Sequence, residues 1–227
     1  CTPTDLVFPF FLFLVGVSMA FSVAPRALDA SVRPALARGV LERALRILLA
    51  GALLHLLIWW ALHTHHFRIW GVLQRIALAY LGAGLVFCFV GARMKALVGI
   101  IAGLLVGYWA LLAFVPIRDI TLDKAALAAL AEQAGDARGA TALKSETNPS
   151  ATKRSPAWAK TEELFRQTKT TTTGQFGPGH NLVNHLDFQF LPGRKYDSFY
   201  DPEGLLSTLP AVATCLLGGL AGVWLRR

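Results

Sequence analysis

Residues 6–24 form a run of nineteen amino acids without a charge, close to the start of the chain. At about 1.5 Å per residue, a helix of this length crosses most of the roughly 30 Å hydrocarbon core of a bilayer. Lipid offers the backbone no hydrogen-bonding partners, so a spanning segment must be a helix or part of a closed barrel. Barrel strands alternate in polarity over about ten residues, and this run does not alternate. The run therefore predicts a membrane-spanning helix.

Four further apolar segments repeat this pattern, at residues 47–62, 76–92, 96–117 and 204–225. The composition agrees, because 54% of the residues are hydrophobic and only 16% are charged, whereas soluble domains carry about 25% charged residues. The sequence thus predicts an all-α fold, a polytopic transmembrane helix bundle with five spans. The long polar stretch before the last segment is expected to be a loop that contains short helices.

Basic residues between the segments indicate the orientation of the bundle, because short cytoplasmic loops are enriched in Lys and Arg. Nine basic residues flank the spans on one side: Arg26, Arg33, Arg38, Arg43, Arg46, Arg93, Lys95, Arg226 and Arg227. The short loop on the other side, HTHHFRIW, contains only Arg68 as a basic residue apart from its histidines. We therefore expect a multi-pass protein of the bacterial inner (plasma) membrane, with Cys1 and the long loop extracytoplasmic.

The long loop divides the chain into three predicted regions. Residues 1–117 hold four transmembrane helices, residues 118–203 form an extracytoplasmic insertion, and residues 204–227 hold the fifth helix. The loop carries eleven basic and eleven acidic residues, so the net charge of +8 belongs to the segments that flank the membrane. This distribution favours contact with the lipid bilayer and argues against nucleic acid as a partner.

Within the loop, local signals predict two helices. Thr121 is expected to cap a helix that stops at Gly135, and Ser155 followed by Pro156 predicts the start of another. Residues 137–154 are strongly polar, and we expect them to lack fixed structure. The loop is either a soluble insertion packed over the bundle or a lid over a site, and its composition favours the first reading without excluding the second.

Asp5, Gln74 and Arg75 are candidate functional residues at the ends of predicted spans. Asp5 ends the sequence TPTD, which is a good helix start in its own right, but its carboxylate could also orient a polar substrate. Arg75 adjoins Gln74 and lies about 7 Å beyond Trp70 along a helix that includes both. A guanidinium at that depth must face protein, water or an anion. It is either a clamp for phosphate or carboxylate or an interfacial residue that pairs with headgroups.

A second polar group precedes the fifth segment and includes Asp187, Asp201 and Glu203. Residues 201–204 are expected to form a turn that leads directly into a helix, whose positive N-terminus favours the two acids. The group fits either a cavity at the mouth of the bundle or a well-capped helix. Three histidines cluster in the short exterior turn without a nearby Cys or acid, and no metal site is expected there: His63, His65 and His66.

Three segments taken together resemble the heparan-α-glucosaminide N-acetyltransferase family: TPTDLVFPFFLFLVGVSMAFS, RIWGVLQRIALAYLGAG, and NLVNHLDFQFLPG followed by YDPEGLLSTLPAVATCLLGGLAG. The resemblance covers nearly the whole chain except residues 119–179. It implies a membrane acyltransferase that moves an acetyl group from acetyl-CoA, as cosubstrate, to an extracytoplasmic amino sugar or glycan. Arg75 and Gln74 lie in the GVLQR motif and are expected to contact CoA. Asp5, Asp187 and Asp201 are supporting candidates around the active site.

The resemblance leaves the catalytic base unassigned. In the family, a catalytic His with an Asn near it lies just before the TPTD motif, and this sequence starts after that point. No His of the chain matches, so residues 1–227 alone are expected to be inactive. A transporter, or a protein that binds glycans or lipid-linked sugars on the same bundle, is the alternative function, and a scaffold without chemistry is a third. A homo-oligomer is compatible with each of these functions.

Overall fold

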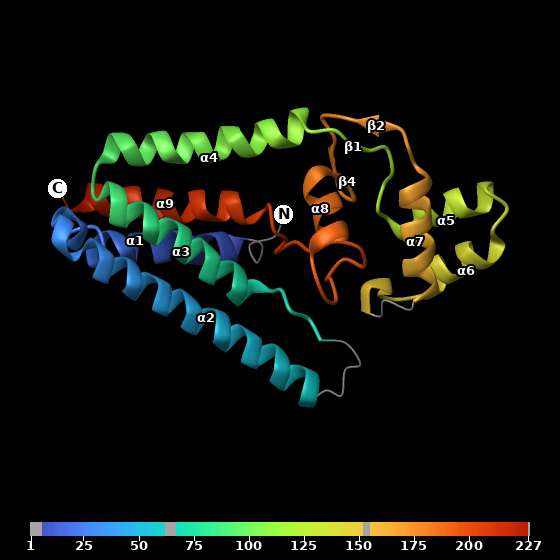
Figure 1. Ribbon diagram of the computed structural model, residues 1–227, viewed down its shortest axis with the longest axis horizontal. Helices are drawn as coiled ribbons and strands as arrows, with labels where there is room; N and C mark the ends of the chain where they lie inside the picture. The colour runs from blue at the N-terminus through green and yellow to red at the C-terminus, as the bar shows by residue number, and fades with distance from the viewer. Residues whose placement is uncertain (1–5, 62–66, 152–154, 227) are drawn as a thin grey trace. The chain divides into compact units, whose positions relative to one another are not determined.

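The computed structural model describes residues 6–61, 67–151 and 155–226, which are mainly helical (Figure 1). The chain divides into two compact units. The first comprises Cys1–Leu53, Gly71–Tyr108 and Thr208–Arg227, and the second comprises Leu54–Trp70 and Trp109–Ser207. Most residues of the long apolar helices belong to the first unit, and the short helices and strands belong to the second.

Five long helices carry the apolar segments, and four of the helices in the described residues are long and apolar enough to cross a membrane. These four are α2 (Arg33–Ala61), α3 (Val72–Val90), α4 (Met94–Phe114) and α9 (Thr208–Leu225). The first apolar run forms α1 (Val7–Ser22), which is shorter at 16 residues. The 3-10 helices η2 (Arg26–Leu28) and η3 (Ala30–Val32) connect α1 to α2. The predicted all-α, polytopic membrane bundle is confirmed.

The helix boundaries differ from the predicted spans at several ends, and the largest difference is at the start of α2. Helix α2 begins at Arg33, fourteen residues before the predicted start at position 47, because an α-helix tolerates charged side chains that a hydropathy pattern excludes. Helix α9 begins at Thr208 instead of residue 204. The Asp201 carboxylate accepts the backbone N–H of Glu203, and the Asp201 carbonyl accepts that of Gly204, so these residues form a turn outside the helix.

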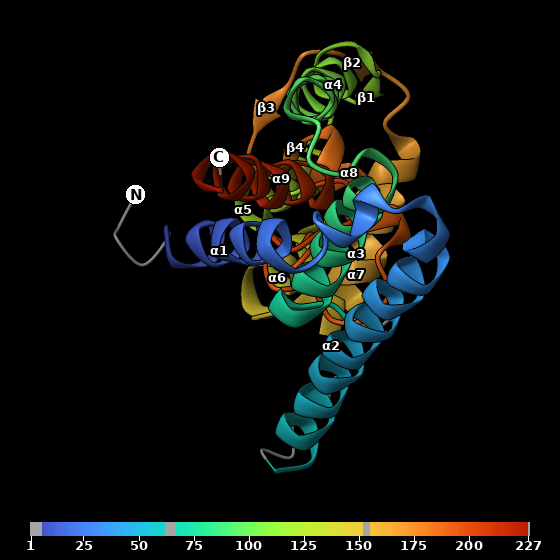
Figure 2. The ribbon, with the colours of Figure 1, turned by 90° about the vertical axis from the view of Figure 1, so that its left-hand side faces the viewer.

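Helix α1 packs along α9 in the first unit (Figure 2). Glycines make this approach close: a Cβ on Gly16 would lie 1.7 Å from the Cys215 carbonyl oxygen, and one on Gly218 would lie 1.9 Å from that of Phe13. Small residues have this use in membranes, where helices associate by packing and not by exclusion from water. The core beside this contact includes Met19, Phe87 and Leu216, which are almost completely buried.

The outer surface of α4 and of the second half of α2 is apolar and uncovered within the described chain. Leucines, tryptophans and phenylalanines along both helices are exposed, among them Leu49, Leu53, Trp60, Val106 and Phe114. In water such a surface would be costly, whereas in a bilayer it is the surface that contacts acyl chains. The exposed faces therefore agree with an integral membrane protein.

Among its described residues, the second unit contains four complete α-helices, which share a core of their own. They are α5 (Lys124–Gln133), α6 (Ala137–Ser145), α7 (Pro156–Gln167) and α8 (Leu182–Phe190), with the short 3-10 helix η4 (Pro149–Ala151) between α6 and α7. Strand β1 (Ile117–Arg118) pairs antiparallel with β2 (Thr171–Thr172), and β3 (Phe176–Gly177) pairs with β4 (His180–Asn181). Aromatic rings fill the core, where Trp158 lies 4.9 Å from Phe188 and 6.2 Å from Phe199 between ring centroids.

Capping residues define the helices of this unit. The cap of α5 differs from the prediction, and α6 was not predicted as a helix. Asp123, not Thr121, caps α5 by accepting the N–H groups of residues 125 and 126. Residues 137–145 form helix α6, so the expectation that residues 137–154 lack fixed structure is wrong for this part, while residues 152–154 lie outside the described residues. Asp136 caps α6 and Leu143 is fully buried. The predicted start of α7, with Ser155 as cap and Pro156 in the first turn, is confirmed.

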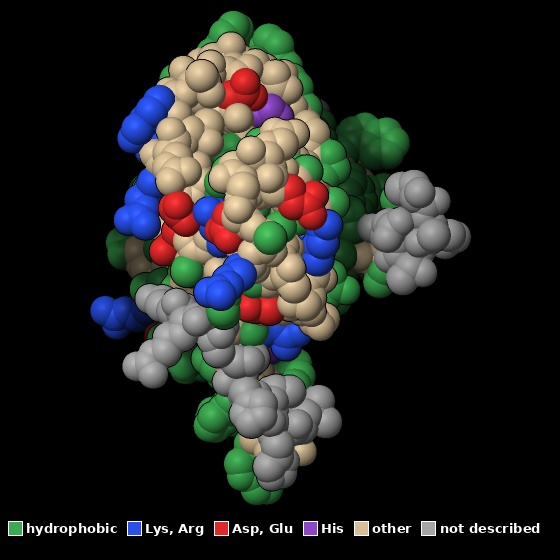
Figure 3. Space-filling model, turned by 90° about the vertical axis from the view of Figure 1, so that its right-hand side faces the viewer, with side chains coloured by type: hydrophobic (Ala, Val, Ile, Leu, Met, Phe, Trp, Pro, Cys, Tyr) green, Lys and Arg blue, Asp and Glu red, His purple; other side chains and the backbone are tan. Residues whose placement is uncertain are grey.

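The surface of the second unit carries both signs of charge. On the face that includes α5, α6 and α7, acidic and basic side chains are interspersed (Figure 3). Several pair with each other, such as Lys160 with Asp136 at 2.9 Å and Lys144 with Glu132 at 2.6 Å. A mixed polar surface of this kind suits contact with water and gives no single-sign field that would attract a polyanion.

Candidate functional site

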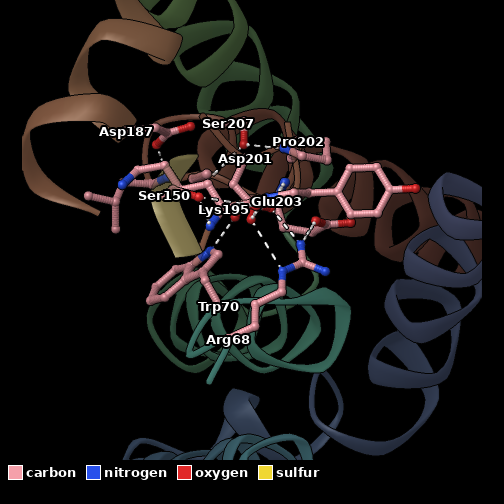
Figure 4. Close-up of polar contacts among 12 residues, drawn as sticks. Arg68, Trp70, Ser150, Asp187, Lys195, Asp201, Pro202, Glu203 and Ser207 are labelled. Atoms are coloured by element: carbon pink, nitrogen blue, oxygen red, sulfur yellow. Dashed lines mark hydrogen bonds and ion pairs between the residues drawn. The ribbon is translucent and has the colours of Figure 1, made fainter. Parts of the chain in front are cut away.

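Arg68 and two acids form the most buried ionic cluster described in the second unit (Figure 4). The Arg68 guanidinium contacts the Asp201 carboxylate through two nitrogens, at 2.7 and 3.3 Å, and one of these nitrogens lies 2.6 Å from the Glu203 carboxylate. The Asp201 side chain is fully buried, and that of Arg68 is 24% exposed. A buried carboxylate needs such a partner, because its desolvation costs several kcal/mol.

The same cluster fixes the turn that precedes α9. Asp201 also accepts the backbone N–H groups of Tyr196 and Glu203, so both of its oxygens are engaged. The indole N–H of Trp70 donates to the Glu203 carbonyl, and the Arg68 guanidinium lies 5.4 Å from the centre of the Tyr196 ring. These contacts assign Asp201 a positioning role: it joins the segment before α3 to the turn at 201–204.

Asp187 contacts the backbone just after this turn but has a different environment. It lies on α8, is completely buried, and accepts the backbone N–H of Leu205 through Oδ1 at 3.0 Å. Its Oδ2 has no hydrogen-bond partner among the described residues. A Cβ on Gly204 would lie 1.9 Å from this oxygen, so only glycine lets the backbone approach the carboxylate so closely. Burial raises the pKa of Asp187 to about 6, against the opposing effect of the Leu205 N–H.

Glu203 completes the acidic side of the cluster. Burial raises the pKa of Glu203, and the neighbouring Asp201 adds to this effect, while the Arg68 cation opposes it. Its side chain is 17% exposed, so one acid of the cluster reaches solvent while Asp187 and Asp201 do not. The structure thus brings the two predicted acids Asp187 and Asp201 to one turn, but it assigns them different surroundings.

The other polar residues of α8 have structural partners. Asn181 caps the helix by accepting the N–H of Asn184, whose side-chain oxygen accepts the N–H of Gly179. His185 is 2% exposed, and its Nε2 lies 3.0 Å from the Ile120 carbonyl oxygen. Burial lowers the pKa of His185 to about 4, so the ring is neutral near pH 7. These contacts hold the helix in place, and Asn184 and His185 are buried.

Arg68 and Lys195 are parts of this region that the sequence did not single out. Lys195 is 2% exposed, and its ammonium lies 4.5 Å from the centre of the Trp158 ring. The backbone N–H of Lys195 donates to the Ser150 hydroxyl. A signal for Arg68 did exist, because it is the sole Lys or Arg in its short loop. For Lys195 no comparable local signal is present.

Gln74 and Arg75 lie in the first unit, near the start of α3. Because α3 begins at Val72, after Gly71, Arg75 is its fourth residue and Trp70 is not helical. Arg75 is half-buried, with its guanidinium 5.2 Å from the centre of the Phe8 ring.

The neighbouring Gln74 is 4% exposed, and neither its amide nitrogen nor its oxygen has a hydrogen-bond partner among the described residues. A Cβ on Gly51 would lie 3.0 Å from both of these atoms, so the glycine provides the space beside the amide. Buried amides are normally paired, because an unpaired one costs about 1–3 kcal/mol. An orphaned amide one residue before an arginine in the sequence is therefore a candidate binding position.

Asp5 and the three histidines of the exterior turn lie outside the described residues. Within the described part of the chain, no group of three or more His, Cys, Asp or Glu side chains has the arrangement of a metal site.

The fold is that of a helical integral membrane protein with buried polar residues. A comparison with protein families defines the class: the model of the heparan-alpha-glucosaminide N-acetyltransferase catalytic domain matches residues 3–133. The chain belongs to this family of membrane transferases. The match includes Arg68, Gln74 and Arg75 and ends with α5, so Asp187 and Asp201 lie beyond it. No curated protein and no solved structure matches the chain.

Proposed function

We propose that this protein transfers an acetyl group from acetyl-CoA to the amino group of an extracytoplasmic sugar or glycan. The family supports transfer to a sugar amine, and the orphaned amide of Gln74 beside Arg75 is the observation that supports a bound donor. Acetyl-CoA offers partners for both groups, since its pantetheine arm carries two amides and its thioester carries a carbonyl oxygen.

The reaction requires charge stabilisation and a base. The amine nitrogen attacks the thioester carbonyl carbon, the new C–N bond forms, the C–S bond breaks, and CoA leaves as a thiolate. The attacking nitrogen loses its proton to a base, and the thiolate takes up a proton from that acid or from water. Negative charge develops on the carbonyl oxygen before the C–S bond breaks, and an arginine directed at this oxygen would lower the barrier.

Arg75 and Gln74 suit the acetyl end of the donor better than its phosphates. Arg75 lies about 4.5 Å along α3 from the helix start, and this start follows the loop that the basic residues predict to be extracytoplasmic. CoA is a cytosolic metabolite, so its nucleotide would remain toward the other face. We assign Gln74 to the pantetheine amides and Arg75 to the developing oxyanion.

The carboxylates have supporting roles in this proposal. Asp201 has both oxygens engaged and positions the turn before α9. Asp187 keeps one oxygen unpartnered among the described residues and has a raised pKa, so it is the better candidate to hold a proton. Asp5, at the start of the first apolar run, is assigned to orienting the acceptor.

Binding of acetyl-CoA to the detergent-purified protein tests the donor assignment. Acetyl-CoA should raise the unfolding temperature of the wild type, because a ligand that binds only the folded state stabilises it. Arg75→Ala and Gln74→Leu should each weaken this binding by about tenfold or more, which corresponds to one lost charged or buried hydrogen bond. Arg138→Ala, at an exposed site on α6 in the second unit, is the matched control and should bind as the wild type does.

Two outcomes would contradict the assignment. Unchanged acetyl-CoA affinity in Arg75→Ala and Gln74→Leu would remove both residues from the donor site. Stabilisation of the wild type by amino sugar but not by acetyl-CoA would favour a transporter or a glycan-binding protein over an acetyltransferase.

A further inference from the structure

A cavity of about 350 Å³ opens on the surface of the first unit, beside the connection between α1 and α2. Residues of the end of α1, of η2 and η3, of the first half of α2 and of α3 line it. In Figure 2 this connection lies next to α3, in agreement with the contacts between η2 and α3. The described site residues Gln74 and Arg75 do not line it, so the cavity is separate from the proposed donor position.

The walls of this cavity are mainly apolar. Leu36 and Val40 contribute side chains from successive turns of α2, and Tyr80 faces them from α3. The hydroxyl of Ser22, a further lining residue, already donates to the Ser18 carbonyl at 2.9 Å. A nucleotide or a free sugar would find few polar partners on such walls, whereas an acyl chain would replace exposed apolar surface with contact.

Gly39 keeps the cavity open. It lines the cavity in the interior of α2, and a Cβ at this position would meet nothing within 4 Å. Glycine in a helix interior costs about 1 kcal/mol relative to alanine. Close packing against another part of the described chain does not require glycine here, in contrast to Gly16 or Gly218 in the contact between α1 and α9.

Two arginines, Arg26 and Arg43, supply positive charge at the edge of the cavity. Both line it, both are exposed, and neither has an ion pair or side-chain hydrogen bond within the described residues. Other arginines of this region are engaged: Arg33 donates to the Ala27 carbonyl, Arg226 donates to that of Ala20, and Arg46 pairs with Glu42. Two free guanidinium groups beside an apolar cavity complement a molecule with an anionic head and a hydrocarbon tail.

The position in the chain indicates where this molecule comes from. Arg43 and Arg46 are the last charged residues of α2 before its apolar half, so Arg43 lies at the level where a helix leaves the hydrocarbon and meets headgroups. Basic pockets between transmembrane helices at this level attract anionic lipids, which the bilayer supplies at high local concentration.

We propose that this cavity binds one anionic phospholipid, with its phosphate held by Arg26 and Arg43 and an acyl chain lying on Leu36, Val40 and Tyr80. Gly39 leaves the space that the chain occupies. The lipid joins the α1–α2 connection to α3 at the membrane surface, and a zwitterionic lipid of the same chain length binds there more weakly because it lacks a net negative charge.

Native mass spectrometry of the delipidated protein in detergent tests this proposal, with phosphatidylglycerol and phosphatidylcholine of matched chains as probes. The wild type should retain phosphatidylglycerol about tenfold more tightly than phosphatidylcholine. The double variant Arg26→Gln/Arg43→Gln should lose this preference. The control Arg38→Gln/Arg46→Gln removes the same charge from exposed positions on α2 that do not line the cavity, and it should keep the preference.

A second pair of variants tests the cavity itself and leaves the charges unchanged. Gly39→Leu should fill the cavity and weaken binding of phosphatidylglycerol, whereas Gly103→Leu, at a position on α4 with equally open surroundings outside the cavity, should not. Circular dichroism shows whether each variant keeps its helices.

Three results would overturn the proposal. Equal retention of the two lipids by the wild type would exclude selection for an anionic headgroup. If Arg26→Gln/Arg43→Gln and the control Arg38→Gln/Arg46→Gln lost the preference for phosphatidylglycerol equally, the cause would be a general effect of surface charge. The third result is displacement of phosphatidylglycerol by acetyl-CoA in the wild type, together with loss of binding of both ligands in Gly39→Leu. This result would make the cavity part of a donor site instead of a lipid site.

Discussion

Asp187 and His185 are both buried on α8, and they respond to pH in opposite directions. Burial raises the pKa of Asp187 to about 6 from 3.8, so the folded state binds the proton more tightly and stability falls as the pH rises between these values. Burial lowers the pKa of His185 to about 4 from 6.5, so the folded state binds the proton less tightly and stability falls as the pH drops through this range. The two effects partly cancel within one pH window.

Single substitutions should separate the two effects. With Asp187→Asn, the free energy of unfolding should rise by about 2 kcal/mol between pH 4 and pH 6.5 relative to the wild-type profile, because only the His185 contribution remains. With His185→Gln, the free energy of unfolding should fall by a similar amount over the same pH range, relative to the wild-type profile, because only the Asp187 contribution remains. Unfolding of the detergent-purified protein at several pH values measures both slopes, and the exposed Glu132→Gln serves as control. A wild-type profile in Asp187→Asn would contradict the raised pKa of this acid.

At the scale of elements, the contact between α1 and α9 depends on glycines. Gly218→Ala would place a Cβ 1.9 Å from the Phe13 carbonyl oxygen, and a backbone atom cannot move aside as a flexible side chain can. The two helices must separate, and we expect a loss of about 2 kcal/mol in stability. Gly103→Ala on α4 meets nothing within 4 Å and should be neutral or slightly stabilising. Thermal unfolding of both variants measures the difference, and equal stability would show that α1 and α9 do not approach this closely.

The sequence predicted the long helices, but it did not predict where each of them begins. Hydropathy detects the part of a helix that faces lipid, so the charged first turns of α2 were left out of the predicted span. Cap residues decide the starts in the loop, and both Thr121 and Asp123 have suitable side chains. In the structure Asp123 is the cap of α5, and its side chain accepts two backbone N–H groups. Helix α6 was missed because its stability comes from the burial of Leu143 and not from a long apolar pattern.

Local sequence motifs predicted individual residues of the functional regions, but they did not predict the long-range partners of these residues. Asp201 was recognised as an acid near a helix start, but its partner Arg68 lies 133 residues away in the chain, and no local pattern specifies such a pair. Gln74 and Arg75 were found through their motif. The lack of a partner for the Gln74 amide depends on the packing of α2 against α3, which a single sequence does not report.

At the scale of the whole molecule, the proposed orientation is open to a direct test by cysteine labelling of intact cells. The basic residues predict that residues 118–203 are extracytoplasmic and that the turn between α3 and α4 is cytoplasmic. Ser145 on α6 and Lys95 at the start of α4 are both exposed, so a thiol at either position can react. A Cys1→Ser background leaves Cys88 and Cys215, which are buried and should not react.

In that background, S145C should react with a membrane-impermeant maleimide in intact cells, and K95C should react only after permeabilisation. The physical reason is the cost of moving nine basic residues across the bilayer against the membrane potential, about 2.3 kcal/mol per charge at 100 mV. The reverse labelling pattern would show that the orientation of the bundle in the membrane is opposite to the predicted one. It would also place Arg75 on the cytosolic face, where it would meet the phosphates of CoA instead of its thioester.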